Sequence, residues 1–218
     1  MKKIFLGPPG SGKGTAASRI APEYNVPHIS TGDLFRKNIQ EGTEIGKKAK
    51  EHMDVGNLVP DEIVMEMLKE RIVCEDCKNG FILDGFPRTI PQAERLSKLT
   101  EIDIVINMVV SDEIVIARNS ARISCSKCGK VYNLRSMPPK IQEKCDQCEA
   151  EVIRRPDDEP HVIKKRLGIY KEQTEPLIDF YRNKKILKDV FCDNLEQTPE
   201  ETFKSVLKVL KDFEKELE

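Results

Sequence analysis

Short apolar runs alternate with segments of helical spacing along this chain. Runs bounded by polar residues or glycine predict buried strands at residues 4–6, 26–29, 81–83, 104–110 and 190–192. Apolar residues that recur every three to four positions predict helices at residues 13–23, 33–40, 45–53, 61–73, 91–99, 112–122, 160–179 and 199–217. Pro176 marks a kink or break in the helix at 160–179. The alternation indicates an α/β fold, with a five-stranded parallel sheet covered by helices on both faces.

Residues 123–159 interrupt this alternation. The segment carries four of the seven cysteines and several prolines, and it shows no long helical pattern. We therefore expect a small domain inserted into a larger α/β core.

The charge balance excludes some classes of function. The chain has 218 residues, with 36 Lys and Arg against 37 Asp and Glu, so its formal net charge is −1. A protein whose whole surface binds nucleic acid or an anionic membrane would be strongly basic. We therefore expect neither partner, although a local cationic site is compatible with this balance.

We find no segment with the pattern of a membrane span or a targeting signal. The apolar run after Met1-Lys2-Lys3 is three residues long, whereas a secretory signal needs about 7–15 apolar residues. A membrane helix needs roughly 18–20. We expect a soluble cytoplasmic protein, and in that compartment paired cysteines more often bind metal than form disulfides.

Residues 7–15, Gly-Pro-Pro-Gly-Ser-Gly-Lys-Gly-Thr, lie between the first predicted strand and the first predicted helix. This is the context of a phosphate-binding P-loop, in which glycines let successive N–H groups converge on a phosphate and the lysine reaches the terminal phosphates. The candidate ATP ligands are Gly10, Ser11, Gly12, Lys13, Gly14 and Thr15. The alternative, a Gly/Pro turn that happens to contain a lysine, is disfavoured by the flanking strand and helix. The sheet is therefore expected to be of the P-loop NTPase type.

Gly14 departs from the general P-loop pattern, which has Ser or Thr directly after the lysine to bind Mg²⁺. The hydroxyl of Thr15 is displaced by one position along the helix. Because Mg²⁺ gives up its water reluctantly, we expect it to be held mainly by nucleotide phosphates and water, with Asp84 in its outer shell.

Cys125, Cys128, Cys145 and Cys148 form two Cys-x-x-Cys pairs separated by sixteen residues. This spacing is typical of a zinc site, in which each pair supplies two thiolates of a tetrahedron. Four thiolates leave no open position for catalysis, so we expect one structural Zn²⁺ in a Cys₄ ribbon. Two disulfides or four free thiols are the alternatives, and both are disfavoured in a cytoplasmic protein.

The other cysteines and the histidines show no metal spacing. Cys74 and Cys77 form a third Cys-x-x-Cys pair, but no second pair remains for them, and Cys192 lies in a predicted strand. We expect all three to be ordinary thiols. The histidines are expected to be bystanders: His28, His52 and His161.

Three motifs resemble the adenylate kinase family. The first is the P-loop variant Gly-x-Pro-Gly-x-Gly-Lys-Gly-Thr at 7–15. The second, Ser-Thr-Gly-Asp-Leu-Phe-Arg at 30–36, is similar to the start of that family's AMP-binding segment. The third, Leu-Asp-Gly-Phe-Pro-Arg-Thr at 83–89 with Pro-Gln-Ala at 91–93, is similar to its signature. The cysteine pairs resemble the subgroup whose lid carries zinc.

The resemblance implies a reversible, Mg²⁺-dependent transfer of a phosphoryl group from ATP to AMP, giving two ADP, by a protein that acts as a monomer. It also implies three parts: a core at 1–29, 60–122 and 160–218, an AMP-binding insert at 30–59, and a lid at 123–159. Both inserts would close over the core and exclude water, which competes for the phosphoryl group.

The resemblance also implies roles for individual residues. The expected AMP ligands are Thr31, Arg36, Met53, Val59, Gly85, Arg88, Gln92, Arg155 and Arg166. Among them, Arg36 and Arg88 would hold the phosphate and Gln92 would contact adenine. Over the ATP phosphates the family places Arg118, Arg122, Arg155 and Arg166, and Tyr132 would also contact ATP. The implied catalytic set is Lys13, Arg88, Arg122, Arg155 and Arg166. The ATP adenine would lie near residues 194–198, where no residue is assigned.

Two other functions compete with this one. A kinase for UMP, CMP or GMP would share most motifs, but UMP/CMP kinases usually have Asn where Thr89 stands, and Thr89 with Gln92 favours AMP. A zinc ribbon that binds nucleic acid, with the P-loop as an ATPase switch, would need interleaved basic and aromatic residues. Residues 123–159 have Tyr132 as their one aromatic, and acidic residues among the basic ones.

Overall fold

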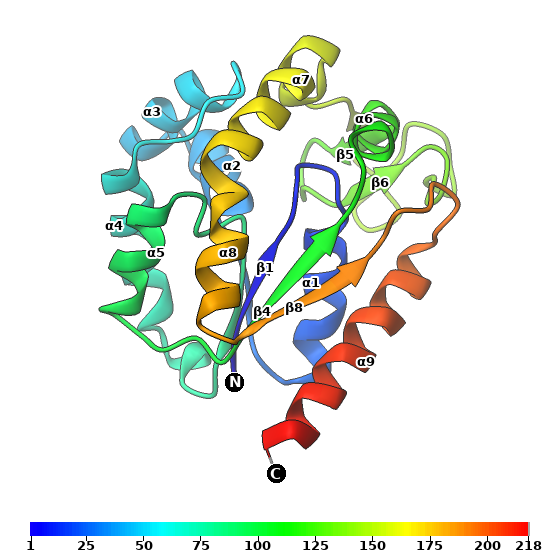
Figure 1. The fold of residues 1–218 in the computed structure, drawn as a ribbon. Coiled ribbons are helices and arrows are strands. Elements are labelled where there is room, and N and C mark those ends of the chain that lie inside the picture. Colours follow the sequence, from blue (N-terminus) through cyan, green and yellow to red (C-terminus); the bar gives the residue numbers. More distant parts are fainter. Residues whose placement is uncertain (218) are drawn as a thin grey trace.

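The computed structural model describes residues 1–217, and its centre is a five-stranded parallel sheet with helices on both faces (Figure 1). The strand order is β2-β3-β1-β4-β8. The bounds are β1 (Lys2–Leu6), β2 (His28–Ser30), β3 (Phe81–Asp84), β4 (Ile104–Val109) and β8 (Leu187–Phe191). Ile4 of the central strand lies opposite Leu83 on one side and Val105 on the other. The expected α/β fold class is confirmed.

Alternation along β1 divides the interior into two hydrophobic cores. Ile4 and Leu6 belong to the core on one face, and Phe5 belongs to the core on the other. The first face is covered by α2 (Thr31–Glu41), α3 (Glu44–Met53), α4 (Asp61–Ile72), α5 (Ile90–Ser97) and α8 (Pro176–Asn183). The second is covered by α1 (Lys13–Glu23) and α9 (Pro199–Leu217). Val206, Leu210 and Phe213 of α9 are buried, which confirms its predicted apolar face.

Most predicted elements differ from the structure by one to three residues at their ends, and two of these differences have a clear cause. The helix predicted over 112–122 is α6 (Asp112–Ser120), and β5 (Arg122–Cys125) begins after one intervening residue. Strand β8 begins at Leu187, three residues before the apolar run that predicted it. Lys188 and Asp189 hide this start because β8 is an edge strand, where polar side chains find partners: Lys188 contacts Glu216, and Asp189 accepts a hydrogen bond from Asn107.

The helix predicted over 160–179 is interrupted before Pro176. Helix α7 (Pro160–Ile169) passes into a π-helical turn, η3 (Tyr170–Thr174), and then into α8. Proline lacks an N–H and clashes with the preceding turn. The turn before it is widened, and the N–H of Glu175 donates to the carbonyl of Tyr170 at 2.8 Å. This turn directs Thr174 toward the functional site described below.

Residues 123–159 contain no long helix, as predicted, and form most of a small antiparallel ribbon. Strand β5 lies between β6 (Val131–Asn133) and β7 (Val152–Ile153), and the short helix η2 (Pro156–Asp158) follows. The ribbon has its own small core, made of Cys125, Tyr132, Cys145 and Val152. The division of the chain into a core and two inserts stays a prediction.

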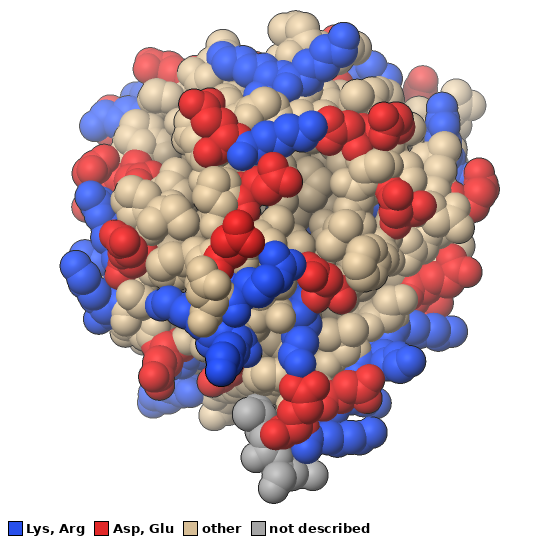
Figure 2. All heavy atoms as spheres, in the orientation of Figure 1, with Lys and Arg blue, Asp and Glu red and all other residues tan. Residues whose placement is uncertain are grey.

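The surface carries both signs of charge. Figure 2 shows Lys and Arg side chains interspersed with Asp and Glu over the face drawn, which agrees with the net charge of −1. Among residues 1–217, no helix combines the length and the apolar character that a membrane span requires.

A lysine lies inside the sheet, at the end opposite the phosphate loop. Lys3 of β1 is fully buried, and its Nζ lies 3.7 Å from the centre of the Tyr24 ring. Burial lowers the pKa of Lys3 to about 8, although the charges of Glu214 and Asp103 oppose the shift. An ammonium group is costly to bury, so Lys3 is a source of pH-dependent stability.

The free energy of unfolding is expected to depend on Lys3 above pH 8. The unfolded chain holds this proton up to a pKa of about 10.4, whereas the folded chain releases it from about pH 8. Stability due to Lys3 therefore rises with pH between these values. Urea unfolding of the wild type and of Lys3→Met at pH 7 and pH 10 measures this contribution. From pH 7 to pH 10, the free energy of unfolding of the wild type should rise relative to that of the variant by about 1 kcal/mol. A difference that is the same at both pH values would contradict the assignment.

Candidate active site and cysteine cluster

Two adjoining cavities lie at the carboxyl end of the sheet. One, of about 580 Å³ up to its open mouth, is lined by residues of α2, α3 and the 54–60 segment, and by Arg88 and Gln92. The other, of about 520 Å³, lies along the P-loop and includes Lys13. Arg88 and Arg166 line both cavities. The two spaces therefore meet at a pair of guanidinium groups.

The P-loop between β1 and α1 is held by its carbonyl groups. The carbonyl of Pro8 accepts hydrogen bonds from the N–H of Ser11 and from Lys13 Nζ, both at 3.1 Å. The carbonyl of Pro9 accepts one from Asn119 Nδ2 at 2.9 Å. The N–H groups of the first turn of α1 lack intrahelical partners, so they are available to a phosphate.

Asp84 explains why Gly14 replaces the usual hydroxyl residue. A Cβ added at Gly14 would lie 2.8 Å from Oδ2 of Asp84, so a side chain there would force the Asp84 carboxylate to move. Asp84 also lies 3.3 Å from His28 Nε2. Burial raises the pKa of Asp84, but the contact with His28 and the charge of Lys13 outweigh it, and the pKa is lowered. Burial in turn lowers the pKa of Lys13 to about 8, against the attraction of Asp84.

Five of the predicted arginines form one cluster: Arg36, Arg88 and Arg166 line the cavities, and the charges of Arg122 and Arg155 act on them. Burial, followed by the charge of Arg166, lowers the pKa of Arg88 to about 10. Burial lowers the pKa of Arg155 to about 9, with Arg36 and Arg122 adding to the shift. The Nη2 of Arg155 is buried without a hydrogen-bond partner among the described residues. Repulsion among these guanidinium groups and an unused N–H donor on Arg155 are features expected of a site that binds polyanions.

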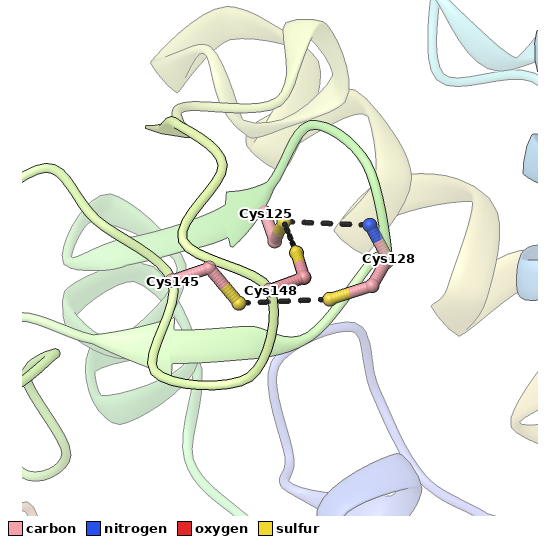
Figure 3. Close-up of side chains that lie close together, drawn as sticks. All are labelled: Cys125, Cys128, Cys145 and Cys148. Atoms are coloured by element: carbon pink, nitrogen blue, oxygen red, sulfur yellow. Dashed lines mark hydrogen bonds between the residues drawn. The ribbon is translucent and has the colours of Figure 1, made fainter.

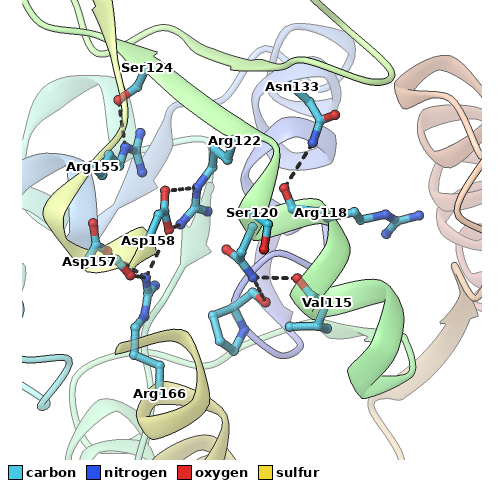
Figure 4. Close-up of polar contacts among 12 residues, drawn as sticks. Val115, Arg118, Ser120, Arg122, Ser124, Asn133, Arg155, Asp157, Asp158 and Arg166 are labelled. Atoms are coloured by element: carbon cyan, nitrogen blue, oxygen red, sulfur yellow. Dashed lines mark hydrogen bonds and ion pairs between the residues drawn. The ribbon is translucent and has the colours of Figure 1, made fainter. Parts of the chain in front are cut away.

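Two aspartates hold part of this cluster in place (Figure 4). Arg122 Nε donates to Asp158 at 2.7 Å, and Arg166 Nη1 donates to Asp157 at 2.7 Å. Asp158 is fully buried. Burial raises the pKa of Asp157, but Arg166 and Arg122 outweigh it and lower the pKa. Both carboxylates therefore pre-position guanidinium groups without neutralising the whole cluster.

The backbone of Arg88 is fixed at both ends. Its N–H donates to Gln92 Oε1 at 2.7 Å, and its carbonyl accepts from Thr174 Oγ1 at 2.8 Å. Its side chain donates through Nε to the carbonyl of Gly85 at 2.8 Å. Thr174 is supplied by the π-helical turn, so the break before Pro176 contributes directly to the site. Three further predicted AMP ligands line the cavity that contains Gln92: Thr31, Met53 and Val59.

The four paired cysteines converge in the ribbon (Figure 3). Their sulfur atoms all lie within 4.8 Å of one another, with Cys125 and Cys148 at 3.4 Å and Cys128 and Cys145 at 3.6 Å. All are free thiols, so the two-disulfide alternative does not match the structure. Sulfur atoms bound to zinc at about 2.3 Å in a tetrahedron would be separated by similar distances.

The comparisons with known proteins decide the family. A sequence model described as "Adenylate kinase" matches residues 5–186. The chain belongs to the adenylate kinase family. It is 53% identical over 195 residues to an adenylate kinase of Archaeoglobus fulgidus, covering 87% of this chain and 90% of that one. Over 215 residues it is 48% identical to an adenylate kinase of Lachnospira eligens, covering 96% and 100%, and 49% identical to one of Acetivibrio thermocellus, covering 96% and 98%.

Membership of the adenylate kinase family confirms what the three motifs predicted and places the chain among the ATP:AMP phosphotransferases. The roles of individual residues stay predictions. The structure brings together Lys13 and the five arginines, and it places Thr31, Met53, Val59, Gly85 and Gln92 around one cavity. The P-loop residues lie at the end of β1, where an adenylate kinase needs them.

Two predicted ATP ligands lie outside the arginine cluster. Arg118 is directed away from Arg122 in Figure 4, and its guanidinium donates to the carbonyl of Ser11 in the P-loop and to those of Cys192 and Asn194. It therefore bridges the P-loop and the 192–198 loop. Tyr132 is 1% exposed, and its hydroxyl donates to Cys145 Sγ at 3.4 Å. Its side chain belongs to the ribbon core, and contact of either residue with ATP stays a prediction.

Sequence reasoning missed several residues near the site. His28, expected to be a bystander, lies against Asp84, and Thr174 holds the carbonyl of Arg88. Asn119 of α6 is fully buried and also donates to the carbonyl of Val115, four residues earlier, at 2.8 Å. None has a motif around it. The one available signal was Asn119 itself, a polar residue in the apolar spacing of a predicted helix.

Asn119→Leu is expected to weaken ATP binding without weakening the fold. The variant removes the hydrogen bond to Pro9, but it also removes Asn119 Oδ1, a buried acceptor with no partner among the described residues. The KM for ATP should rise about fivefold, equivalent to one hydrogen bond of ~1 kcal/mol. The KM for AMP and the melting temperature should change little, as for the control Ser120→Ala on the same helix. A large loss of stability with an unchanged KM for ATP would contradict this role.

Proposed function

We propose that the protein catalyses the reversible reaction MgATP + AMP ⇌ MgADP + ADP, with AMP in the cavity that contains Gln92 and ATP along the P-loop. The observation that carries this proposal is the meeting of two cavities at Arg88 and Arg166. A transfer between two nucleotides requires their terminal phosphates to meet at one point. Such a reaction balances the pools of adenine nucleotides.

The chemistry needs little covalent work from the protein. An oxygen of the AMP phosphate forms a bond to the γ-phosphorus of ATP, while the bond from that phosphorus to the β–γ bridging oxygen breaks. Because the AMP phosphate is already anionic at neutral pH, no general base is required. Lys13 and the arginines would hold the reacting groups in line and stabilise the charge that spreads over the transferred group. Arg88 and Arg166 lie where both phosphate chains would end.

The residues around Asp84 fit a Mg²⁺ that is bound mainly by the nucleotide. Asp84 has a lowered pKa and lies beside the first turn of α1, but Gly14 offers no hydroxyl ligand. Asp84 would accept hydrogen bonds from water on the ion rather than bind it directly. When bound, Mg²⁺ would neutralise charge on the phosphates of ATP.

The cysteine cluster fits one structural Zn²⁺. Burial raises the pKa of Cys145, but the hydrogen bonds from Tyr132 and from the N–H of Gln147 outweigh it and lower the pKa to about 6. Thiolates are the form that binds zinc. The ribbon core has few apolar residues, so a metal would supply stability that packing does not.

We further propose that residues 30–59 and 123–159 close over the core formed by 1–29, 60–122 and 160–218. The ribbon supports this because its hydrophobic core is separate from the two cores of the sheet. Closure would keep water from the γ-phosphate. The cytoplasmic location and the monomeric state expected from the sequence stay predictions.

A panel of nucleotides tests the proposed function. Purified protein with MgATP should form ADP with AMP and react much more slowly with UMP, CMP or GMP. The alternative of a different nucleoside monophosphate kinase predicts the reverse, so turnover with UMP and none with AMP would overturn the proposal.

In the same assay, Arg88→Ala should lower kcat by about 10³, the usual contribution of an arginine that stabilises transferring phosphate. Arg95→Ala is the matched control, because Arg95 is exposed on α5 and lies 3.6 Å from Glu62. Circular dichroism should show that both variants fold. A near-normal kcat for Arg88→Ala would contradict its role.

Metal analysis tests the zinc site. The purified protein should contain about one zinc per chain, as expected for a closed Cys₄ site. Cys145→Ser should lose the metal, and amide exchange within 123–159 should become fast. Cys74→Ser is the control and should keep it, because Cys74 is exposed and outside the cluster. A metal-free wild type with equally protected amides in 123–159 would exclude a structural zinc.

A further inference from the structure

The side chain of Gln92 lies on the wall of the cavity assigned above to AMP, and its hydrogen bonds fix which way its amide faces. The residue is 2% exposed and lies in the first turn of α5. Met53 and Val59 line the same cavity with apolar surface, and Arg36 lines it with a cation. A nucleotide presents matching parts: apolar base faces, a charged phosphate, and a base edge that must form hydrogen bonds. Gln92 is the uncharged hydrogen-bonding side chain suited to the edge.

An amide can face a base in two ways that differ by a half turn. In each orientation, Oε1 accepts from a donor on the base edge and Nε2 donates to an acceptor. A half turn exchanges the positions of Oε1 and Nε2, so it requires the donor and the acceptor of the base in the reverse order. Adenine presents an acceptor at N1 and a donor at N6. Guanine and hypoxanthine present a donor at N1 and an acceptor at O6. The base that Gln92 accepts therefore depends on what sets its orientation.

Two neighbours set the orientation of the Gln92 amide. The N–H of Arg88, which can only donate, lies 2.7 Å from Gln92 Oε1. A carboxylate oxygen of Asp61, which can only accept, lies 2.6 Å from Gln92 Nε2. A half turn would bring N–H against N–H and oxygen against oxygen. One hydrogen of Nε2 and one lone pair of Oε1 are left for a ligand, so Nε2 can donate to N1 of adenine and Oε1 can accept from N6.

Asp61 is itself held in place. It is the first residue of α4, where the helix dipole favours a negative charge. Its other carboxylate oxygen accepts from Thr89 Oγ1 at 3.2 Å, and the same Thr89 oxygen caps α5 by accepting from the N–H of Gln92 at 3.3 Å. The Asp61 carboxylate therefore joins the start of α4 to the start of α5. It contacts both Thr89, in the signature motif, and Gln92.

We propose that Asp61 is a positioning residue that determines base specificity: by fixing the Gln92 amide, it makes the cavity accept adenine and reject 6-oxopurines. This inference rests on the proposed function. Asp61 contacts no part of the reaction itself, because its partners are the side chains of Gln92 and Thr89.

Asp61→Asn tests the proposal, with AMP and IMP as acceptors. IMP differs from AMP only at N1 and C6, so it probes the edge that Gln92 would contact. An asparagine offers either an oxygen or an NH₂ group, so it no longer dictates the amide's orientation. The ratio of kcat/KM for AMP to that for IMP should fall at least about tenfold, roughly one mismatched polar contact. The KM for ATP should not change.

Glu62→Gln is the matched control. It removes one negative charge from the same helical turn, but Glu62 lies 3.6 Å from Arg95 rather than near Gln92. Its AMP:IMP ratio should equal that of the wild type. Asp61→Glu retains an acceptor and should recover most of the discrimination. If Asp61→Asn does not fold, Asp61→Ser removes the carboxylate while keeping a residue favoured at helix starts, and AMP and IMP binding can be measured by calorimetry.

The outcomes separate the two levels of the argument. If the wild type does not phosphorylate AMP, the proposed function fails. If the wild type uses AMP and the variants lacking the Asp61 carboxylate keep the AMP:IMP ratio, this inference alone is wrong. Equal losses for both nucleotides, with a lower melting temperature, would show that Asp61 serves only the stability of α4.

Discussion

Six cations held together at the carboxyl end of the sheet are the constraint on which the rest of the site depends. Lys13, Arg88 and Arg155 have lowered pKa values because burial and their like-charged neighbours disfavour the charged forms. The four nearby carboxylates are those of Asp33, Asp84, Asp157 and Asp158. Because cations outnumber carboxylates, the cluster is destabilising until anions arrive. Phosphates of two nucleotides would supply the missing charge, so binding and charge neutralisation are the same event.

Two of these cations, Arg122 and Arg155, lie at or near the ends of ribbon strands. Arg122 opens β5, and Arg155 lies two residues after β7. Arg155 Nε also donates to Ser124 Oγ on the central ribbon strand at 3.0 Å. A ribbon with so small a core would not by itself keep these ends in register, whereas four cysteine ligands on two turns would. A metal bound by the four cysteines would therefore bear on phosphate binding through strand geometry, although the sulfur atoms lie within the ribbon.

Much of the fold and of the site could be predicted because local patterns encode them. Buried parallel strands contain runs of apolar residues, and the P-loop motif is recognisable from its own residues. The start of β8 was missed because Lys188 and Asp189 on an edge strand carry no apolar signal. His28, Asp61 and Asn119 act through contacts with residues distant in sequence, and no spacing rule joins them to their partners. Arg118 contacts the P-loop and also the 192–198 loop, in which the sequence assigned no residue.

Charge and neutral hydrogen bonds have different tasks in this site. The arginines would attract any phosphate, so they would supply affinity and stabilise the transferred group, but they could not distinguish one base from another. Discrimination requires a donor and an acceptor in a fixed order, and an amide supplies both only when it cannot turn. At one end of the cavity proposed for AMP, repulsion among guanidinium groups favours the binding of anions. At the other end of this cavity, the N–H of Arg88 and the carboxylate of Asp61 prevent the Gln92 amide from turning. Arg88 takes part in both, since its side chain faces the phosphate region and its backbone N–H orients the amide.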